Sequence, residues 1–294
     1  MLVTFYGVRG SIAAPGPSTV KYGGNTSCVH VRLNTGINLI FDAGTGIRKL
    51  GMKMRQNDEP LLLLLSHGHW DHIQGYPFFD PIYQPGREIR VCQGVDSNEL
   101  ALKAILDQMD GSNFPVAAED LPSKITTVQE VDEYLNQQSF RTIRKTLNHP
   151  GGGNAYRIEE DGVSIAYITD NELDPPGEPQ TTYGEWVDLC QGVDLLIHDA
   201  QYIENDMPAK HGWGHSLISQ VRQLAVDSQV KNLVMYHHDP ERSDAELDEI
   251  AIESAKYFKS NNSMIGSFIA AEGLSFELTA RKDPKVSTID LHNN

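Results

Sequence analysis

The pattern of apolar and polar positions in the first part of the chain predicts β-strands joined by short turns. Residues 61–65 are five consecutive leucines, which is typical of a strand buried on both faces, although periodicity alone does not distinguish it from a buried helix. Residues 28–33 alternate apolar with polar side chains as a half-exposed strand does, and residues 37–44 continue after a turn that ends in Gly36. Together with the apolar residues 2–8, these segments predict a β-meander.

The remainder of the chain alternates predicted strands with predicted helices. Strands are expected at residues 88–93, 141–147, 156–159, 163–168, 193–197 and 233–236, and helices at about 97–109, 181–190, 216–226 and 243–259. Ser243 and Glu246 form a capping-box pattern at the start of the last helix. Two apolar segments, residues 265–270 and 274–278, flank Glu272 and Gly273 and predict a closing hairpin.

No exact internal repeat is present, and we expect one domain over residues 1–280. The polar residues 281–294 are expected to form a frayed tail, in which His292 has no role. Residues 110–138 mix glycine, proline, aromatic and acidic residues without a clear period, but they are too apolar for a flexible linker. We interpret them as an insertion that covers the mouth of a site or contacts a second subunit.

Candidate metal chemistry follows the leucine run directly. Within six residues the chain places four side chains that bind metals in proteins, namely His67, His69, Asp71 and His72. Imidazole and carboxylate groups are ligands of a borderline cation such as Zn²⁺. In an extended or turn conformation His67 and His69 can share one ion, whereas a helix that begins near Asp71 carries the other two ligands to a second ion. Histidines that collect after a strand by chance are the alternative, but a core has no use for this spacing.

Three further side chains with metal-site chemistry follow predicted strands. His149 precedes three glycines, which let the backbone approach another group closely. Asp170 ends the strand at residues 163–168, where a carboxylate can lend one oxygen to each of two ions. Asp42 ends the strand at residues 37–44 before a glycine-rich turn. Considered alone, His149 is a loop histidine and Asp42 is a turn or helix cap, so these patterns leave both roles open.

The motif at residues 67–72 resembles that of the metallo-β-lactamase superfamily of two-metal hydrolases, and further matches cover most of the chain. The closest resemblance is to the subgroup that contains ribonuclease Z and related phosphodiesterases. It implies an α/β fold, the four-layer αβ/βα sandwich. It also implies a first ion held by His67, His69 and His149, a second ion held by Asp71, His72 and His237, and a bridging Asp170. Asp42 would support the segment from His67 to His72, which we call the metal loop.

Two short segments carry the rest of the resemblance. The last metal histidine of these phosphodiesterases stands at a strand end, which selects His237 over His238 after residues 233–236. In ribonuclease Z an acidic residue orients a histidine proton donor, and the matching positions here imply that Asp199 orients His215. The acidic residue is aspartate rather than the usual glutamate, so its reach is one methylene shorter. The alternative for His215 is a position just before a capped helix start.

The ligand set predicts two divalent metal ions, with Zn²⁺ first and Mn²⁺ or Fe as alternatives. A water shared between two cations loses a proton near neutral pH and can attack a phosphorus or carbonyl centre. Asp71 can orient this nucleophile, and protonation of an alkoxide by His215 favours phosphodiester hydrolysis. A small nucleotide-type diester such as a cyclic nucleotide is the leading hypothesis. A carboxylic ester, lactone or thioester is the alternative substrate, and a non-catalytic ligand sensor is the alternative class.

Charge and composition set the expected partners and location. The chain has 24 basic and 40 acidic residues, a formal net charge of −16, and no cluster of lysines or arginines, so it repels polyanions at long range. A small-molecule phosphodiester is therefore expected as substrate, and no large nucleic acid. No membrane partner is expected, because neither a membrane span nor a signal-peptide layout is present. The three cysteines are scattered, which argues against a disulfide framework and for a cytoplasmic location; a homodimer remains an option.

Overall fold

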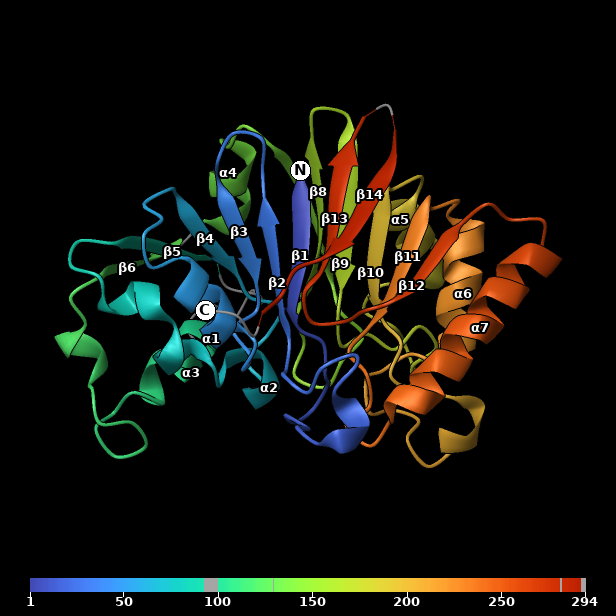
Figure 1. Cartoon of the computed structure of the whole chain (residues 1–294), viewed down its shortest axis with the longest axis horizontal. Coiled ribbons are helices and arrows are strands. Elements are labelled where there is room, and N and C mark those ends of the chain that lie inside the picture. Colours follow the sequence, from blue (N-terminus) through green and yellow to red (C-terminus); the bar gives the residue numbers. More distant parts are fainter. Residues whose placement is uncertain (93–99, 129, 281, 292–294) are drawn as a thin grey trace.

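Two β-sheets face each other at the centre of the computed structural model, which describes residues 1–92, 100–128, 130–280 and 282–291 (Figure 1). The strands of the first sheet lie in the order β14 (Lys282–Thr288), β13 (Leu274–Thr279), β1 (Leu2–Gly7), β2 (Cys28–Arg32), β3 (Asn38–Phe41), β4 (Leu61–Leu64), β5 (Glu88–Cys92) and β6 (Lys124–Val128). Those of the second sheet lie in the order β12 (Gly266–Ile269), β11 (Asn232–Tyr236), β10 (Leu195–Asp199), β9 (Val163–Ile168), β8 (Asn154–Glu160) and β7 (Arg141–Thr146).

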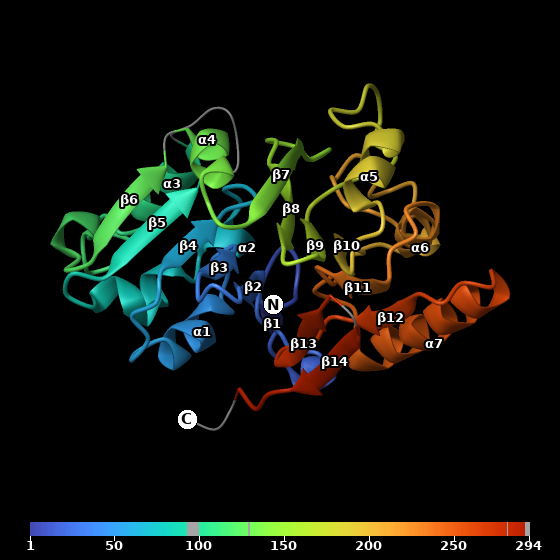
Figure 2. The same ribbon diagram turned by 90° about the horizontal axis from the view of Figure 1, so that it is seen from above.

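Helices cover the outer faces of both sheets, as the view from above shows (Figure 2). On the first sheet these are α1 (Ile47–Lys53), α2 (Trp70–Ile73) and α3 (Leu100–Asp107), and on the second α5 (Tyr183–Cys190), α6 (Ile218–Asp227) and α7 (Asp244–Ser260). Helix α4 (Val131–Asn136) contacts β7. Short 3-10 helices occur at Pro17–Thr19, Tyr76–Phe78, Asp80–Tyr83, Ala118–Asp120 and Glu204–Asp206. The four-layer α/β sandwich expected from the sequence is confirmed.

The leucine run is strand β4, and its apolar character on every position has a direct cause. Leu62 and Leu64 face the core between the two sheets, whereas the outer core beneath α1 receives Leu61, Leu63 and Leu65. Successive side chains of a strand point to opposite faces, so a strand between two cores needs apolar residues throughout. The strand is parallel to its neighbours β3 and β5, which places its carboxyl end beside theirs.

The parallel strands of both sheets end at the same edge of the sandwich. Strands β9, β10, β11 and β12 are parallel to one another, as β3 to β6 are in the first sheet. Residues that follow β4, β9 and β11 meet there. His237 Nε2 lies 3.2 Å from Asp71 Oδ2 and 3.0 Å from Asp170 Oδ1. The fold therefore brings together polar side chains that are distant in the sequence.

The predicted closing hairpin is wrong, because its two strands belong to different sheets. Strand β12 is parallel to β11, whereas β13 is antiparallel to β1. Between them the Glu272 N–H donates to the carbonyl of Tyr22 and the Gly273 N–H donates to the carbonyl of Phe5, each at 2.8 Å. A turn containing glycine indicates that the chain changes direction, but it does not show which strands pair across the turn. Here each of the two strands pairs with a strand of a different sheet.

The predicted frayed tail is also wrong for the described residues after Ala280. Residues 282–288 form β14, which is antiparallel to β13 with Phe276 opposite Val286. Beyond it, the Ile289 N–H donates to the Gly273 carbonyl at 2.8 Å, and Leu291 is buried. Polar composition misled the prediction because backbone pairing along a sheet edge does not require apolar side chains on both faces. His292 lies outside the described residues.

The described part of residues 110–138 contributes to both the first sheet and the central core. Strand β6 is the edge strand beside β5. Val131 and Leu135 of α4 are buried between the sheets, and the ring of Phe114 packs edge-on against Phe78 with centroids 5.3 Å apart. The segment is thus built into the domain; its role as a cover of the site or as a subunit contact stays a prediction.

The capping box at the start of α7 gives the first testable prediction. The Glu246 N–H donates to Ser243 Oγ at 3.3 Å, and the Ser243 N–H donates to the Glu246 carboxylate at 2.8 Å. Loss of an N-cap hydroxyl typically costs about 1 kcal/mol, so Ser243→Ala should lower the free energy of unfolding in urea by about that amount. Glu246→Gln is the control, because an amide oxygen can still accept the Ser243 N–H. Equal unfolding curves for Ser243→Ala and wild type would contradict the prediction.

Candidate metal centre

The candidate ligands occupy loops and a short helix at the carboxyl edge of the two sheets. His67 lies in the turn after β4, and His69 is the N-cap of α2, which carries Asp71 and His72. Asp170 follows β9, and the other two ligands follow β7 and β11. The structure brings all seven predicted ligands into two adjoining groups that share Asp170, the first with His67, His69 and His149 and the second with Asp71, His72 and His237.

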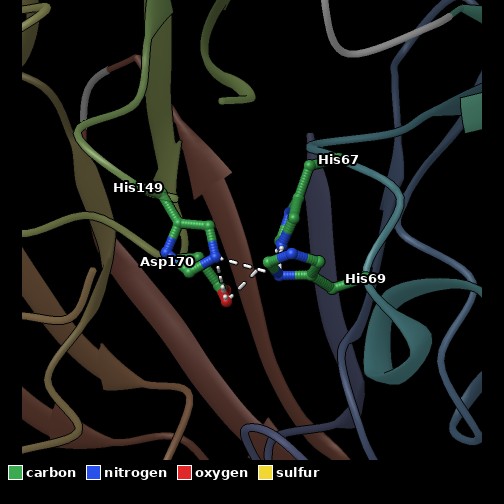
Figure 3. Close-up of side chains that lie close together, drawn as sticks. All are labelled: His67, His69, His149 and Asp170. Atoms are coloured by element: carbon green, nitrogen blue, oxygen red, sulfur yellow. Dashed lines mark hydrogen bonds and ion pairs between the residues drawn. The ribbon is translucent and has the colours of Figure 1, made fainter. Parts of the chain in front are cut away.

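The first group joins three imidazoles and one carboxylate, with His149 and Asp170 approaching from one side and His67 and His69 from the other (Figure 3). His69 Nδ1 lies 3.0 Å from Nε2 of His67 and 3.0 Å from Nε2 of His149. Asp170 Oδ2 lies 3.7 Å from both of those Nε2 atoms. Three nitrogens and one oxygen thus converge on a small volume, with the solvent-exposed His69 on its outer side.

The second group is buried and contains two carboxylates. Asp170 Oδ1 lies 3.0 Å from Nε2 of His72 and 3.0 Å from Nε2 of His237. Asp71 Oδ2 lies 3.2 Å from each of the same two nitrogens. Asp170 therefore turns one oxygen to each group, which is the arrangement of a carboxylate that bridges two cations.

Hydrogen bonds on the far side of the imidazoles fix which nitrogen faces each group. His149 Nδ1 donates to the carbonyl of Gly214 at 3.0 Å, and His237 Nδ1 donates to Gln201 Oε1 at 3.0 Å. His72 Nδ1 donates to Asp42 at 2.9 Å. Each Nδ1 then carries the proton, so each Nε2 presents a lone pair to the group, as metal-binding histidines do.

Asp42 lies behind the metal loop, as the resemblance implies. Its carboxylate accepts hydrogen bonds from the Ser66 N–H at 2.7 Å and from the hydroxyl of Tyr167 at 2.7 Å, besides that from His72. Asp42 has a φ of 61°, a left-handed conformation in which aspartate is tolerated better than most residues. Its contacts position the loop and the His72 ring; they do not cap a helix.

The protonation states in the two groups suit cation binding. Burial lowers the pKa of His149 to about 4, and burial together with neighbouring imidazoles lowers the pKa of His67. Burial also lowers the pKa of His72, but Asp170, Asp71 and Asp42 outweigh it and hold the pKa above its ordinary value, so a cation in the second group would take the place of a proton on this ring. Burial raises the pKa of Asp71 and of Asp170, but the surrounding histidines outweigh it and hold both pKa values well below the usual range. Neutral imidazole and ionised carboxylate are the forms that bind metal ions. The donor set and its tautomers therefore fit a divalent metal centre.

Asp199 and His215 form a pair beside both groups. His215 Nδ1 lies 2.8 Å from Asp199 Oδ2, so the shorter aspartate side chain still reaches the imidazole. The His215 ring stacks on His237 with centroids 5.2 Å apart and lies 5.4 Å from the ring of His149. Burial lowers the pKa of His215, but the carboxylates, Asp199 first, outweigh it and raise the pKa to about 9. The Asp199 carboxylate thus favours the protonated form of the His215 ring.

The neighbouring histidines that the sequence leaves aside have structural partners. His238 Nε2 donates to the carbonyl of Ala270 at 2.8 Å and belongs to neither ligand group. His211 lies 3.0 Å from the carbonyl of Asp174. The geometry thus places His237 in a candidate ligand group and His238 outside both, and the assignment of His237 as a ligand stays a prediction.

Three residues that support the site were not predicted from the sequence. Gln201 holds His237, and the Ser11 N–H donates to Asp71 Oδ2 at 2.8 Å. The buried carboxylate of Glu172 accepts the N–H groups of Gly212 and Gly214 at 2.9 and 3.0 Å. No local pattern marks these residues, because their partners lie tens of residues away in the chain.

We expect about two divalent ions per chain, because the residues offer two donor sets. Asp71→Ala removes a ligand of the second group only and should lower the metal content to about one ion, as elemental analysis would measure. Asp188→Ala, on helix α5, is the control and should keep both ions. A wild-type content of one ion or none would contradict the prediction.

The chain is similar to a known protein family and to several ribonucleases Z. Residues 37–238 match the family described as the Beta-lactamase superfamily domain. A ribonuclease Z of Saccharolobus solfataricus is 36% identical over 250 residues, which cover 71% of this chain and 81% of that protein. A ribonuclease Z of Halobacterium salinarum is 25% identical and the match covers 94% of this chain and 97% of that protein. The short form of human tRNase Z has a TM-score of 0.61 at 20% identity, covering 95% of this chain and 100% of that structure.

The relatives correct the expectation about partners. Their names denote enzymes of RNA, so the expectation that no large nucleic acid is a partner is wrong. A net charge of −16 describes the whole molecule, whereas a nucleic acid is held by local groups, and bound cations would place positive charge at the site itself. Among the described residues, no helix has both the length and the apolar character of a membrane span.

Proposed function

Because the chain belongs to the metallo-β-lactamase superfamily and is a metal-dependent hydrolase related to ribonuclease Z, we propose that it hydrolyses a nucleotide phosphodiester with an alkoxide leaving group. The observation that carries this proposal is the pairing of His215 with Asp199 at 2.8 Å, beside both candidate ligand groups. An alkoxide is a poor leaving group in water, so its departure gains from a positioned acid.

The chain's own residues have distinct roles in this proposal. The two groups would hold two divalent ions, for which Zn²⁺ suits the nitrogen-rich donor set and Mn²⁺ or Fe are alternatives. When bound, such ions lower the pKa of water and stabilise negative charge on the phosphoryl oxygens. Asp71, fixed by the Ser11 N–H, can accept a hydrogen bond from the attacking water and orient it.

His215 would act as the proton donor. Its Nδ1 is engaged by Asp199, which leaves Nε2 for the leaving oxygen of the substrate. The ring lies next to one histidine of each group, His149 and His237, so an ester oxygen held between the groups would lie beside it. Asp199 would keep the imidazole in one orientation and stabilise its charged form, since it also accepts the N–H groups of Asn171 and Gln201.

The proposed substrate is a small nucleotide-derived diester, such as a cyclic nucleotide. RNA is an equal candidate, because the names of the relatives denote enzymes of RNA. A carboxylic ester, lactone or thioester is the alternative substrate. Its cleavage depends less on a proton donor, so the His215–Asp199 pair argues against it.

A hydrolysis screen tests the proposal. Metal-loaded protein would be assayed on 2′,3′- and 3′,5′-cyclic nucleotides, on a transfer-RNA precursor, and on a lactone and a thioester, with Asp71→Ala as the control for contaminating activity. We expect turnover of at least one phosphodiester, and loss of that turnover in Asp71→Ala. Turnover confined to the lactone or thioester would overturn the proposal.

A further inference from the structure

Two of the three tryptophans lie exposed beside the candidate metal ligands. Trp70 is 77% exposed and Trp213 is 59% exposed, whereas Trp186 is fully buried in the core under α5. A ligand that covers an exposed indole removes a large apolar face from water, so an exposed tryptophan beside a site is a candidate contact for a ligand.

Trp70 is part of the metal loop itself. It stands between His69 and Asp71 as the first residue of α2. Its carbonyl accepts the Gln74 N–H at 2.8 Å, and the His69 carbonyl accepts the His72 N–H at 3.0 Å. The backbone under the exposed ring is thus held in a regular helical turn, so the ring projects from a fixed point next to the ligands.

Trp213 also projects from a fixed backbone, in the loop between β10 and α6. The N–H groups on either side of it, of Gly212 and Gly214, both bind the buried carboxylate of Glu172. The Gly214 carbonyl in turn accepts the proton of His149 Nδ1 at 3.0 Å. The same loop therefore holds a candidate metal ligand and presents an exposed tryptophan.

Each tryptophan is a chain neighbour of a residue that belongs to the first ligand group or binds one of its members. Trp70 follows His69, and Trp213 precedes Gly214, whose carbonyl binds His149. His69 and His149 meet at 3.0 Å between Nδ1 and Nε2. They are also the least buried of the four ligands in that group. Ile12, which follows Ser11 at the edge of the second group, adds a further apolar side chain that is 60% exposed.

We propose that Trp70 and Trp213 bind the base of a nucleotide substrate by stacking, and so select nucleoside diesters over diesters without a base. The inference rests on the proposed phosphodiesterase function and names the part of the substrate that lies outside the metal centre. Flat indole rings stack on any base, and removal of one such ring typically weakens binding by about 1–3 kcal/mol, roughly 5- to 150-fold. Protein partners would need a far larger apolar surface than these side chains offer.

A pair of chromogenic diesters tests the proposal. Thymidine 5′-(4-nitrophenyl) phosphate and methyl 4-nitrophenyl phosphate share one leaving group and differ in the presence of a nucleoside. Trp70→Ala and Trp213→Ala should each raise the KM for the thymidine ester by about 5- to 150-fold and leave kcat/KM for the methyl ester within about twofold, with unchanged metal content. Trp70→Phe and Trp213→Phe should restore part of the affinity, because a phenyl ring also stacks.

Met264→Ala is the matched control, because Met264 is 98% exposed and precedes β12. It therefore lies at the amino-terminal end of the parallel strands, whereas the candidate ligands lie at the carboxyl-terminal end. The substitution should change neither ester's kinetics. Equal losses on both esters in the tryptophan variants would overturn the proposal and indicate that the rings support the metal loop.

A binding measurement keeps the inference separate from the proposed function. Thymidine monophosphate should quench the fluorescence of the exposed tryptophans in metal-loaded wild-type protein, and methyl phosphate should not. If neither diester is hydrolysed but the quenching occurs and disappears in Trp70→Ala and Trp213→Ala, the phosphodiesterase proposal fails and base binding stands. Absence of quenching, or quenching that both variants retain, overturns the inference.

Discussion

Replacing His237 with alanine is expected to abolish hydrolysis and to lower metal content. Its Nε2 lies 3.0 Å from Asp170 Oδ1 and 3.2 Å from Asp71 Oδ2, so it is the candidate ligand that joins the end of β11 to the rest of the second group. Loss of a residue that merely supports a ligand typically costs about 10- to 100-fold in metal affinity or activity, and loss of the ligand itself should cost at least as much. We therefore expect less than about 1% of wild-type activity on any phosphodiester substrate, with elemental analysis showing the missing ion.

His238→Ala is the matched control for this prediction. His238 is the adjacent residue and is equally buried, but its Nε2 donates to the carbonyl of Ala270 instead of facing a ligand. Its loss leaves a buried carbonyl without that partner, which typically costs about 1–3 kcal/mol of stability. Metal content should stay near that of the wild type. If His238→Ala loses metal and His237→Ala keeps it, the assignment of the ligand at this strand end is wrong.

The metal loop and most strands could be predicted from the sequence because their determinants are local. Five leucines specify a strand between two cores, and a ligand-dense turn follows it at once. His149, Asp170 and His237 could be placed because each follows a strand, and parallel strands bring their carboxyl ends to one edge. The resemblance to a known family then assigned each residue to one ion, which spacing alone could not do.

Features that depend on distant partners could not be predicted in this way. Gln201 is an ordinary polar residue until the fold brings it to 3.0 Å from His237 Nδ1. The strands around Glu272 were expected to form a hairpin, but β12 pairs with β11 in one sheet and β13 pairs with β1 in the other. The expectation that no large nucleic acid binds was based on the net charge of the whole chain, which does not describe the local groups that bind a substrate.

The proton donor is the residue on which the phosphodiesterase proposal depends, and His215→Ala tests it. General acid catalysis typically contributes about 10²–10⁴-fold, so the rate on a diester with an alkoxide leaving group should fall by that range. A nitrophenolate departs readily without protonation, so the same variant should lose much less activity on a nitrophenyl diester. Both ions and the fold should be retained, because His67, His69 and the other candidate ligands are unchanged.

Asp199→Asn refines this test, since it keeps the imidazole and alters only its partner. The amide can still contact His215 Nδ1, but it no longer stabilises the positive charge of the ring, so we expect the same substrate-dependent pattern with a smaller loss. An equal loss on both kinds of leaving group would indicate a role in binding or structure. His215, Asp199 and His237 also offer ligand atoms close enough to hold one ion. Loss of metal in His215→Ala would therefore indicate that His215 is a ligand, and the assignment of His237 would have to be revised.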